Sequence, residues 1–210
     1  MKKTRCVIIA AGDISDNYII KNNVLPGDFV IAADAGYYNC VNAGVTPDLI
    51  VGDFDSGKKP ETLIETIILN PVKDSTDSET ALSEAEKRGY KDIILLGATG
   101  KRLDHTLANI LLTASAKQRG RSLTIIDEHH KIYAVKNETK IIQRSKSKYY
   151  LSVYAVGGDC EITEEGVYYP LNKYILSPFS ALGVSNEITD DSAKITVYSG
   201  TAVIIEADKF

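Results

Sequence analysis

The chain has 210 residues, 44% of them hydrophobic and 25% charged, which is ordinary for a soluble globular protein of one large or two small domains. The formal net charge of −4 gives no basic surface for nucleic acid, and no apolar segment approaches the roughly 20 residues that span a membrane. The basic N-terminus lacks the apolar region and cleavage site of a signal peptide, so we expect a cytoplasmic protein that binds neither nucleic acid nor membrane.

In the first part of the chain, up to about Asp127, apolar runs alternate with helical patterns, as in successive βαβ units. Continuous Val, Ile and Leu runs without alternation are typical of parallel strands that are covered on both faces. Each run is followed by Gly or Asp, at the strand end where such sheets bind their ligands. The sequence therefore predicts an α/β domain with a Rossmann-like parallel sheet. Its expected strands are Cys6–Ala11, Phe29–Ala33, Leu49–Val51, Ile93–Leu96 and Leu123–Ile126.

Two carboxylates that are two residues apart, Asp53 and Asp55, follow the run Leu49–Val51. Residues i and i+2 of an extended backbone point the same way, so both acids are expected to leave the strand end together. Paired acids repel one another unless a cation lies between them, and Mg²⁺ binds one or two carboxylates together with substrate phosphates. A solvated acidic turn is the alternative. The other runs that end in Gly or Asp favour a metal–nucleotide site.

A capping box marks the start of a helix, since Thr76 and Glu79 have the spacing that satisfies the first free backbone N–H groups. Gly89 has the position of a C-terminal cap, so we expect the helix to end just before it. Asp77 then lies in the first turn. Taken alone, this acid is explained as a favourable partner of the helix dipole.

The segment between the run Ile93–Leu96 and the next helix combines small residues with basic ones. The turn Gly97–Gly100 brings backbone N–H groups toward an anion, and Lys101 and Arg102 add positive charge. We therefore expect a phosphate cradle, although the segment is not a P-loop. His105 is a candidate base or phosphate donor, and it is equally well explained as a hydrogen-bonded structural residue.

The helix that follows this turn is expected from near Leu103 to before Gly120. Apolar residues at i, i+4, i+7, i+8 and i+11 predict its buried stripe. Arg102, His105 and Asn109 fall near one another on another face. The expected stripe consists of Leu103, Leu107, Ile110, Leu111 and Ala114.

The sequence pattern changes after about Lys131, beyond which no long helix is indicated. Tyr149–Val156 and Ile195–Ile205 are expected to form strands, with turns at Gly157-Gly158 and Ser199-Gly200. Strands rich in half-buried aromatic residues suit a β-sandwich or a sheet that packs on a partner. We therefore expect two domains, an α/β domain over residues 1–130 and an all-β sandwich over residues 131–210.

Five motifs occur in order along nearly the whole chain. They are Ala33-Asp34-Ala35-Gly36, Pro47-Asp48-x-Ile50-x-Gly52-Asp53-Phe54-Asp55-Ser56, Thr76-Asp77, Gly100-x-Arg102-x-Asp104-His105-x-x-x-Asn109 and Gly183-Val184-Ser185-Asn186-Glu187. In their order and spacing these motifs resemble the thiamine pyrophosphokinase family. Two departures stand out: Ala98 replaces the second glycine of a Gly-Gly turn, and Tyr169 occupies a stretch in which the family often carries Trp. Alanine is tolerated at position 98 if φ is negative and disfavoured in the left-handed region.

The resemblance implies that the pyrophosphoryl group of ATP is transferred to the hydroxyl of thiamine, with thiamine diphosphate and AMP as products. It also implies a homodimer that binds thiamine near the subunit interface. Phosphoryl chemistry depends mainly on positioning and charge neutralisation, so the implied catalytic residues are the Mg²⁺ ligands and one arginine. The implied assignments are Asp53, Asp55 and Asp77 for Mg²⁺, with Arg102 as the further catalytic residue; Asp34, Gly100, Arg102, Asp104, His105 and Asn109 for ATP; and Tyr169, Ser185 and Asn186 for thiamine.

Two other functions are compatible with the same residues. A pyrophosphokinase for another alcohol, such as a hydroxymethylpterin, would have much the same nucleotide site, and Ser185-Asn186 argues against it. A non-catalytic Mg-nucleotide-binding protein would bind without turnover, and Ala98 and the missing Trp are its best support. Against it, every acidic position of the matching motifs is present. Asp34 and Asp77 are both candidates for the base that takes the hydroxyl proton.

Overall fold

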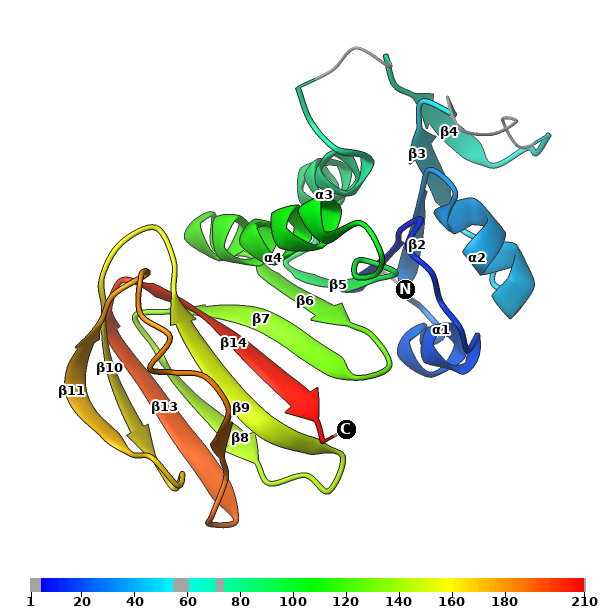
Figure 1. The fold of residues 1–210 in the computed structure, drawn as a ribbon. Coiled ribbons are helices and arrows are strands. Elements are labelled where there is room, and N and C mark those ends of the chain that lie inside the picture. The colour runs from blue at the N-terminus through cyan, green and yellow to red at the C-terminus, as the bar shows by residue number, and fades with distance from the viewer. Residues whose placement is uncertain (1–4, 55–60, 71–73, 210) are drawn as a thin grey trace. The chain divides into compact units, whose positions relative to one another are not determined.

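The protein is described by a computed structural model that covers residues 5–54, 61–70 and 74–209. It has a mixed α/β fold with a large sheet and a second, four-stranded antiparallel sheet (Figure 1). The chain divides into two units, and each has its own cluster of buried hydrophobic side chains. The first unit consists of Met1–Asn109 and Ile125–Glu128, and the second of Ile110–Thr124 and His129–Phe210.

In the described residues of the first unit, five parallel strands pair in the order β5-β1-β2-β3-β4. Four of them correspond to predicted apolar runs, so the prediction of parallel strands is confirmed for these four, and the fifth predicted run forms the strand β6 (Ser122–Ile126). β4 was not predicted, because its residues are only partly buried or exposed and give no continuous apolar run. The parallel strands are β1 (Arg5–Ile9), β2 (Phe29–Ala33), β3 (Leu49–Gly52), β4 (Glu65–Ile68) and β5 (Asp92–Leu96).

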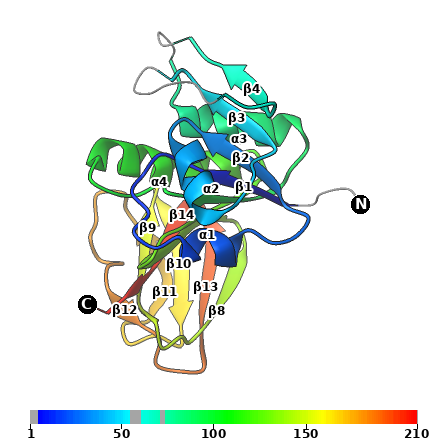
Figure 2. The same cartoon turned by 90° about the vertical axis from the view of Figure 1, so that its right-hand side faces the viewer.

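Helices cover both faces of these strands (Figures 1 and 2). On one face, α1 (Tyr18–Asn23) and α2 (Gly36–Ala43) bury Ile20 and Cys40 against β1, β2, β3 and β5. On the other, α3 (Asp77–Lys87) contacts β1, β2 and β3. Two covered faces explain why these strands carry apolar residues at every position instead of alternating.

The helix boundaries predicted from Thr76 and Gly89 are confirmed. The hydroxyl of Thr76 accepts a hydrogen bond from the backbone N–H of Glu79 at 3.2 Å, as a helix cap does. Gly89 follows the last turn of α3 with φ of +89°, in the left-handed conformation that glycine adopts without strain.

The second predicted helix is also present, as α4 (Leu103–Gln118), but its predicted buried stripe is wrong. Leu103 is 76% exposed, and Leu107 and Leu111 are exposed as well; of the predicted stripe only Ala114 is fully buried. Short polar side chains that make hydrogen bonds take part in the buried face instead, where apolar periodicity cannot detect them. The buried residues of α4 are Asn109, Leu112, Thr113, Ala114 and Ala116.

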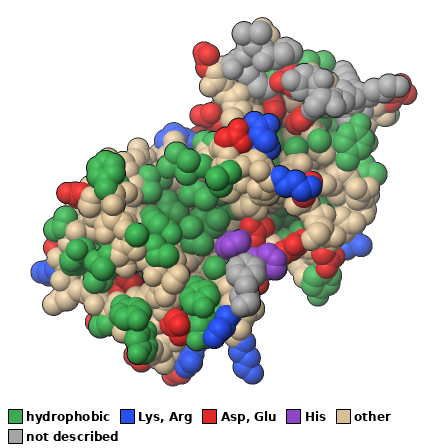
Figure 3. All heavy atoms as spheres, in the orientation of Figure 1, with side chains coloured by type: hydrophobic (Ala, Val, Ile, Leu, Met, Phe, Trp, Pro, Cys, Tyr) green, Lys and Arg blue, Asp and Glu red, His purple; other side chains and the backbone are tan. Residues whose placement is uncertain are grey.

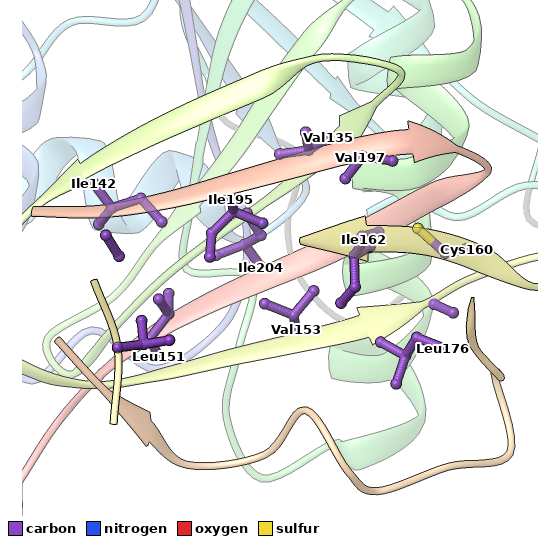
Figure 4. Close-up of a cluster of buried hydrophobic side chains, with 14 of the residues drawn as sticks. Val135, Ile142, Leu151, Val153, Cys160, Ile162, Leu176, Ile195, Val197 and Ile204 are labelled. Carbon is purple, nitrogen blue, oxygen red and sulfur yellow. The ribbon is translucent and has the colours of Figure 1, made fainter. Parts of the chain in front are cut away.

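The second unit contains two antiparallel sets of four strands, ordered β12-β9-β14-β7 and β11-β10-β13-β8. Buried side chains from both sets form one cluster, in which Val153 and Ile204 lie beside Ile162 and Ile195 (Figure 4). The strands are β7 (His130–Lys136), β8 (Thr139–Gln143), β9 (Lys148–Ala155), β10 (Cys160–Glu165), β11 (Leu171–Leu176), β12 (Asn186–Glu187), β13 (Ser192–Ser199) and β14 (Thr201–Asp208).

The predicted strand Ile195–Ile205 is two strands, β13 and β14, which belong to different sheets. The chain passes from one to the other at Gly200, whose φ is +85°. A side chain there would lie 2.5 Å from the carbonyl oxygen of Asp159, so only glycine fits. The predicted turn at Ser199-Gly200 is therefore confirmed, and it links two sheets.

Of the helices in the described parts of the chain, none could span a membrane, since none combines the necessary length with the necessary hydropathy.

Candidate active site

A cleft of about 780 Å³ lies in the first unit, at the carboxyl ends of its parallel strands. It is bordered by the segments that follow β1, β2, β3 and β5, by the start of α3 and by the first turns of α4. This is the edge at which the sequence predicted a ligand. The predicted residues that line it are Asp34, Asp53, Asp77, Gly100, Arg102, His105 and Asn109.

The cleft wall between β1 and β5 is made of closely packed backbone. The N–H of Gly12 donates to the carbonyl oxygen of Gly97 at 2.9 Å, and a side chain on Gly12 would lie 2.3 Å from that oxygen. Asn39 of α2 fixes the same segment, since its Nδ2 donates to the carbonyl oxygens of Ala10 at 3.0 Å and Gly12 at 3.1 Å. Sequence reasoning missed Asn39, because nothing in its neighbourhood shows that its partners lie on another element.

The three described acids of the prediction come from separate elements. Asp34 follows β2, Asp53 follows β3 and Asp77 begins α3, and all three line the cleft. Asp34 has φ of +49° and Phe54 has φ of +55°, and left-handed backbone at non-glycine residues is concentrated at functional sites. Asp55 lies outside the described residues.

Carboxylate oxygens are the ligands that Mg²⁺ prefers, so the side chains of Asp53 and Asp77 are of the kind that fits this ion. Within the described residues, no three His, Cys, Asp or Glu side chains are grouped closely enough to hold a metal by themselves. A site for Mg²⁺ here would therefore be completed by Asp55, by substrate oxygens or by water.

Basic residues stand on the other border of the cleft. Lys101 forms an ion pair of 2.9 Å with Asp13. Arg102 donates from Nε and Nη2 to the two carboxylate oxygens of Asp104, at 2.9 and 2.7 Å. These hydrogen bonds hold the pKa of Asp104 far below its usual range and raise that of Arg102. Arg102 lines the cleft and Asp104 does not, so Asp104 orients the guanidinium from outside.

The turn Gly97–Gly100 is held by two side-chain hydrogen bonds. The buried Asn109 donates from Nδ2 to the carbonyl oxygen of Ala98 at 2.7 Å, and the hydroxyl of Thr99 donates to Asp127 at 2.6 Å. Gly97 and Gly100 have positive φ, whereas the described non-glycine residues with positive φ do not include Ala98. Alanine at position 98 is therefore accommodated without strain.

The residues predicted to bind thiamine lie together in the second unit, although Tyr169 is remote in sequence from Ser185 and Asn186. The Asn186 side chain bonds the backbone of Tyr169 twice: Oδ1 accepts from its N–H at 3.0 Å and Nδ2 donates to its carbonyl oxygen at 2.9 Å. Ser185 has φ of +58°, and its N–H donates to the hydroxyl of Ser152 at 3.0 Å. The Tyr169 side chain is 66% exposed and packs edge-to-face on Tyr168.

Apolar side chains are numerous on the surface of the second unit (Figure 3). They include Tyr168, Tyr169, Phe179, Leu182 and Val184, each of which is at least 40% exposed.

Cations on one border of a cleft, with carboxylates on another, are the charges that a site for a metal-bound polyphosphate requires. The fold and the cleft thus fit an α/β phosphotransferase. The family models agree: residues 21–125 match "Thiamin pyrophosphokinase, catalytic domain" and residues 138–202 match "Thiamin pyrophosphokinase, vitamin B1 binding domain". The chain belongs to the thiamin pyrophosphokinase family.

Individual relatives agree with the family match. The chain is 29% identical over 184 residues to thiamine pyrophosphokinase of Bacillus subtilis (strain 168), covering 84% of this chain and 86% of that protein. It is similar to the crystal structure of the B. subtilis thiamine pyrophosphokinase, with a TM-score of 0.89, 25% identity and coverage of 99% and 100%. The thiamin pyrophosphokinase structure from Geobacillus thermodenitrificans gives a TM-score of 0.85, 26% identity and 98% coverage of both chains.

Proposed function

We propose that this chain is a thiamine pyrophosphokinase, which transfers the pyrophosphoryl group of ATP to the hydroxyl of thiamine and releases AMP. The observation that carries the proposal is the match of both parts of the chain to the two domains of one family. The vitamin B1 binding match over residues 138–202 argues against a hydroxymethylpterin as the acceptor. In this proposal residues 1–130 form a Rossmann-like nucleotide domain and residues 131–210 form a β-sandwich, and the protein acts as a homodimer.

The nucleotide end of the proposed reaction uses the cleft of the first unit. Backbone N–H groups of the turn Gly97–Gly100 face the polyphosphate, and Arg102, oriented by Asp104, donates to it from Nη1. His105 and Asn109 border the same space, and Asn109 also keeps the turn in place. These groups hold the β-phosphorus where the thiamine hydroxyl can attack it, since phosphoryl transfer depends mainly on positioning.

Asp53, Asp55 and Asp77 are proposed to hold Mg²⁺. When bound, Mg²⁺ offsets the negative charge of the phosphate oxygens and of the departing AMP. Asp34 stands beside them with a backbone that is fixed by a hydrogen bond from its N–H to the carbonyl oxygen of Val51 at 2.7 Å. It is proposed to shape the nucleotide site and is one candidate for the base, with Asp77 as the other.

The thiamine end uses the second unit. The exposed ring of Tyr169 provides an aromatic face for the thiamine rings, in the stretch where the family often carries Trp. Asn186 is hydrogen-bonded to the backbone of Tyr169, and Ser185 precedes Asn186 in the chain.

The test is an incubation of the purified protein with Mg-ATP and thiamine, followed by chromatographic separation of nucleotides and thiamine esters. We expect AMP and thiamine diphosphate in equal amounts. ADP with thiamine monophosphate would contradict transfer of the pyrophosphoryl group. Product from a hydroxymethylpterin but none from thiamine would contradict the substrate, and Mg-ATP binding without any product would indicate a non-catalytic binder.

A further inference from the structure

The side-chain amide of Asn186 has no hydrogen-bonding capacity left for a ligand. An amide offers two donors and two acceptor lone pairs. Nδ2 donates to the carbonyl oxygen of Tyr169 at 2.9 Å and to Oε2 of Glu164 at 3.0 Å. Oδ1 accepts from the N–H of Tyr169 and from that of Glu187, both at 3.0 Å. Asn186 therefore holds protein groups in place and is not itself available to thiamine.

Glu164 is an unexpected partner for this amide. It lies on β10 between the register positions of Leu171 and Ile195, and its side chain is 1% exposed. Oε1 is buried and accepts no hydrogen bond from any residue that the structure describes. Burial raises the pKa of this carboxyl to about 7, against the opposing effect of the Asn186 hydrogen bond. An apolar residue would fill this position without the cost of burying a carboxyl, so the bond to Asn186 is the contribution that Glu164 makes.

The hydrogen bonds form a chain that ends at an exposed aromatic ring. Glu164 fixes one donor of Asn186, and with it the orientation of the amide plane. Asn186 then fixes the backbone of Tyr169 on both its N–H and carbonyl sides. The ring of Tyr169 is exposed and contacts Tyr168 edge-to-face, so the backbone that carries the ring sets the point from which it projects.

We infer that Glu164 and Asn186 are positioning residues for thiamine binding. They set the point from which the Tyr169 side chain projects by fixing the backbone of Tyr169 through hydrogen bonds. The inference rests on the proposed function and deepens it, because it assigns part of the affinity for the acceptor substrate to a buried acid that never touches it. Positioning of this kind acts on thiamine and not on ATP, since Glu164, Asn186 and Tyr169 all lie in the second unit.

The test compares Glu164→Leu, which removes the acceptor at similar volume, with Glu164→Gln, which keeps an acceptor for Asn186 Nδ2. Loss of one buried hydrogen bond predicts a KM for thiamine about tenfold higher in the Leu variant, with the KM for ATP within about twofold. The Gln variant is expected to stay within about threefold of the wild type in both.

Thr163→Val is a matched control on the same strand. Thr163 is also buried, and its hydroxyl accepts from the N–H of Lys173 at 2.9 Å, in a bond that involves neither Asn186 nor Tyr169. We expect this variant to lower stability and to leave the KM for thiamine unchanged. If Glu164→Leu does not fold, Asn186→Asp serves in its place, because it removes both donors and keeps the oxygens that accept from Tyr169 and Glu187. The same rise in the KM for thiamine is expected of it, and an unchanged KM would overturn the inference.

An unchanged KM for thiamine in the Leu variant, or an equal rise with Thr163→Val, would overturn the inference while leaving the proposed function intact. A Gln variant as impaired as the Leu variant would overturn the role of the acceptor. If the wild type itself makes no thiamine diphosphate, the proposed function fails, and the inference fails with it.

Discussion

Raising the pH should lower the free energy of unfolding through the ionisation of Glu164. The carboxyl has an ordinary pKa of 4.5 in the unfolded chain and a pKa of about 7 in the folded protein. A folded-state pKa above the unfolded one stabilises the protein fully below pH 4.5, and the contribution is lost as pH rises through about 7. The slope in that window is about 1.4 kcal/mol per pH unit for one group. Between pH 5 and pH 8 the expected loss is about 2.5 kcal/mol.

The measurement is urea denaturation of the wild type and of Glu164→Gln at several pH values, followed by far-UV circular dichroism. Every other titratable group is common to the two proteins, so the difference between their unfolding free energies isolates position 164. We expect the wild type to lose stability relative to the Gln variant from pH 5 to pH 8, with the steepest change between pH 5 and 7. Parallel stability curves would refute the reasoning, since they would mean that Glu164 titrates alike in both states.

Three substitutions in the first unit test the cleft. Asp53→Asn should lower turnover on the order of 100-fold or more without changing stability. Asp92→Asn is the control and should leave turnover unchanged, because Asp92 begins β5 and the cleft lies at the other end of that strand. Near-normal turnover of the Asp53 variant at saturating Mg²⁺ would show that Asp53 is not a metal ligand. Asn39→Ala removes two hydrogen bonds to the Ala10–Gly12 segment, so it should lower the unfolding free energy by about 2 kcal/mol and raise the KM for ATP. If only the stability changed, Asn39 would have no role in ATP binding. Gly12→Ala brings a methyl group against the carbonyl oxygen of Gly97 and should lower the unfolding free energy by about 1–3 kcal/mol, and an unchanged melting temperature would contradict that close approach.

The parallel strands could be predicted because burial on both faces leaves a direct trace in the sequence, as in Leu49–Val51. The start of α3 could be predicted because Thr76 makes its hydrogen bond within four residues. The buried stripe of α4 could not, because Asn109 and Thr113 are buried through hydrogen bonds that hydropathy does not register. β4 lacks a signal for the opposite reason, since its side chains are not fully buried.

The candidate site divides in the same way. Asp34 and Asp53 follow strands, so chain position alone predicted that they would line one cleft, whereas Asp77 was assigned to the site only by the family resemblance. Their roles toward Mg²⁺ and ATP stay predictions. Asn39 and Glu164 could not be found from the sequence, because their partners are backbone groups and an amide on elements remote in the chain. Such residues are recognised only when the tertiary contacts are known.

The position of β14 in its sheet has a consequence for how the second unit folds during synthesis. β14 lies between β9 and β7, two strands that precede it by a long stretch of chain and do not pair with each other. Until β14 has been synthesised, both strands present an unpaired edge, and edges of this kind recruit other chains. The pairing is also strongly non-local, which slows folding. A nascent chain that stalls after Gly200 should therefore be prone to aggregation, and insertion of β14 should be the step that ends this risk.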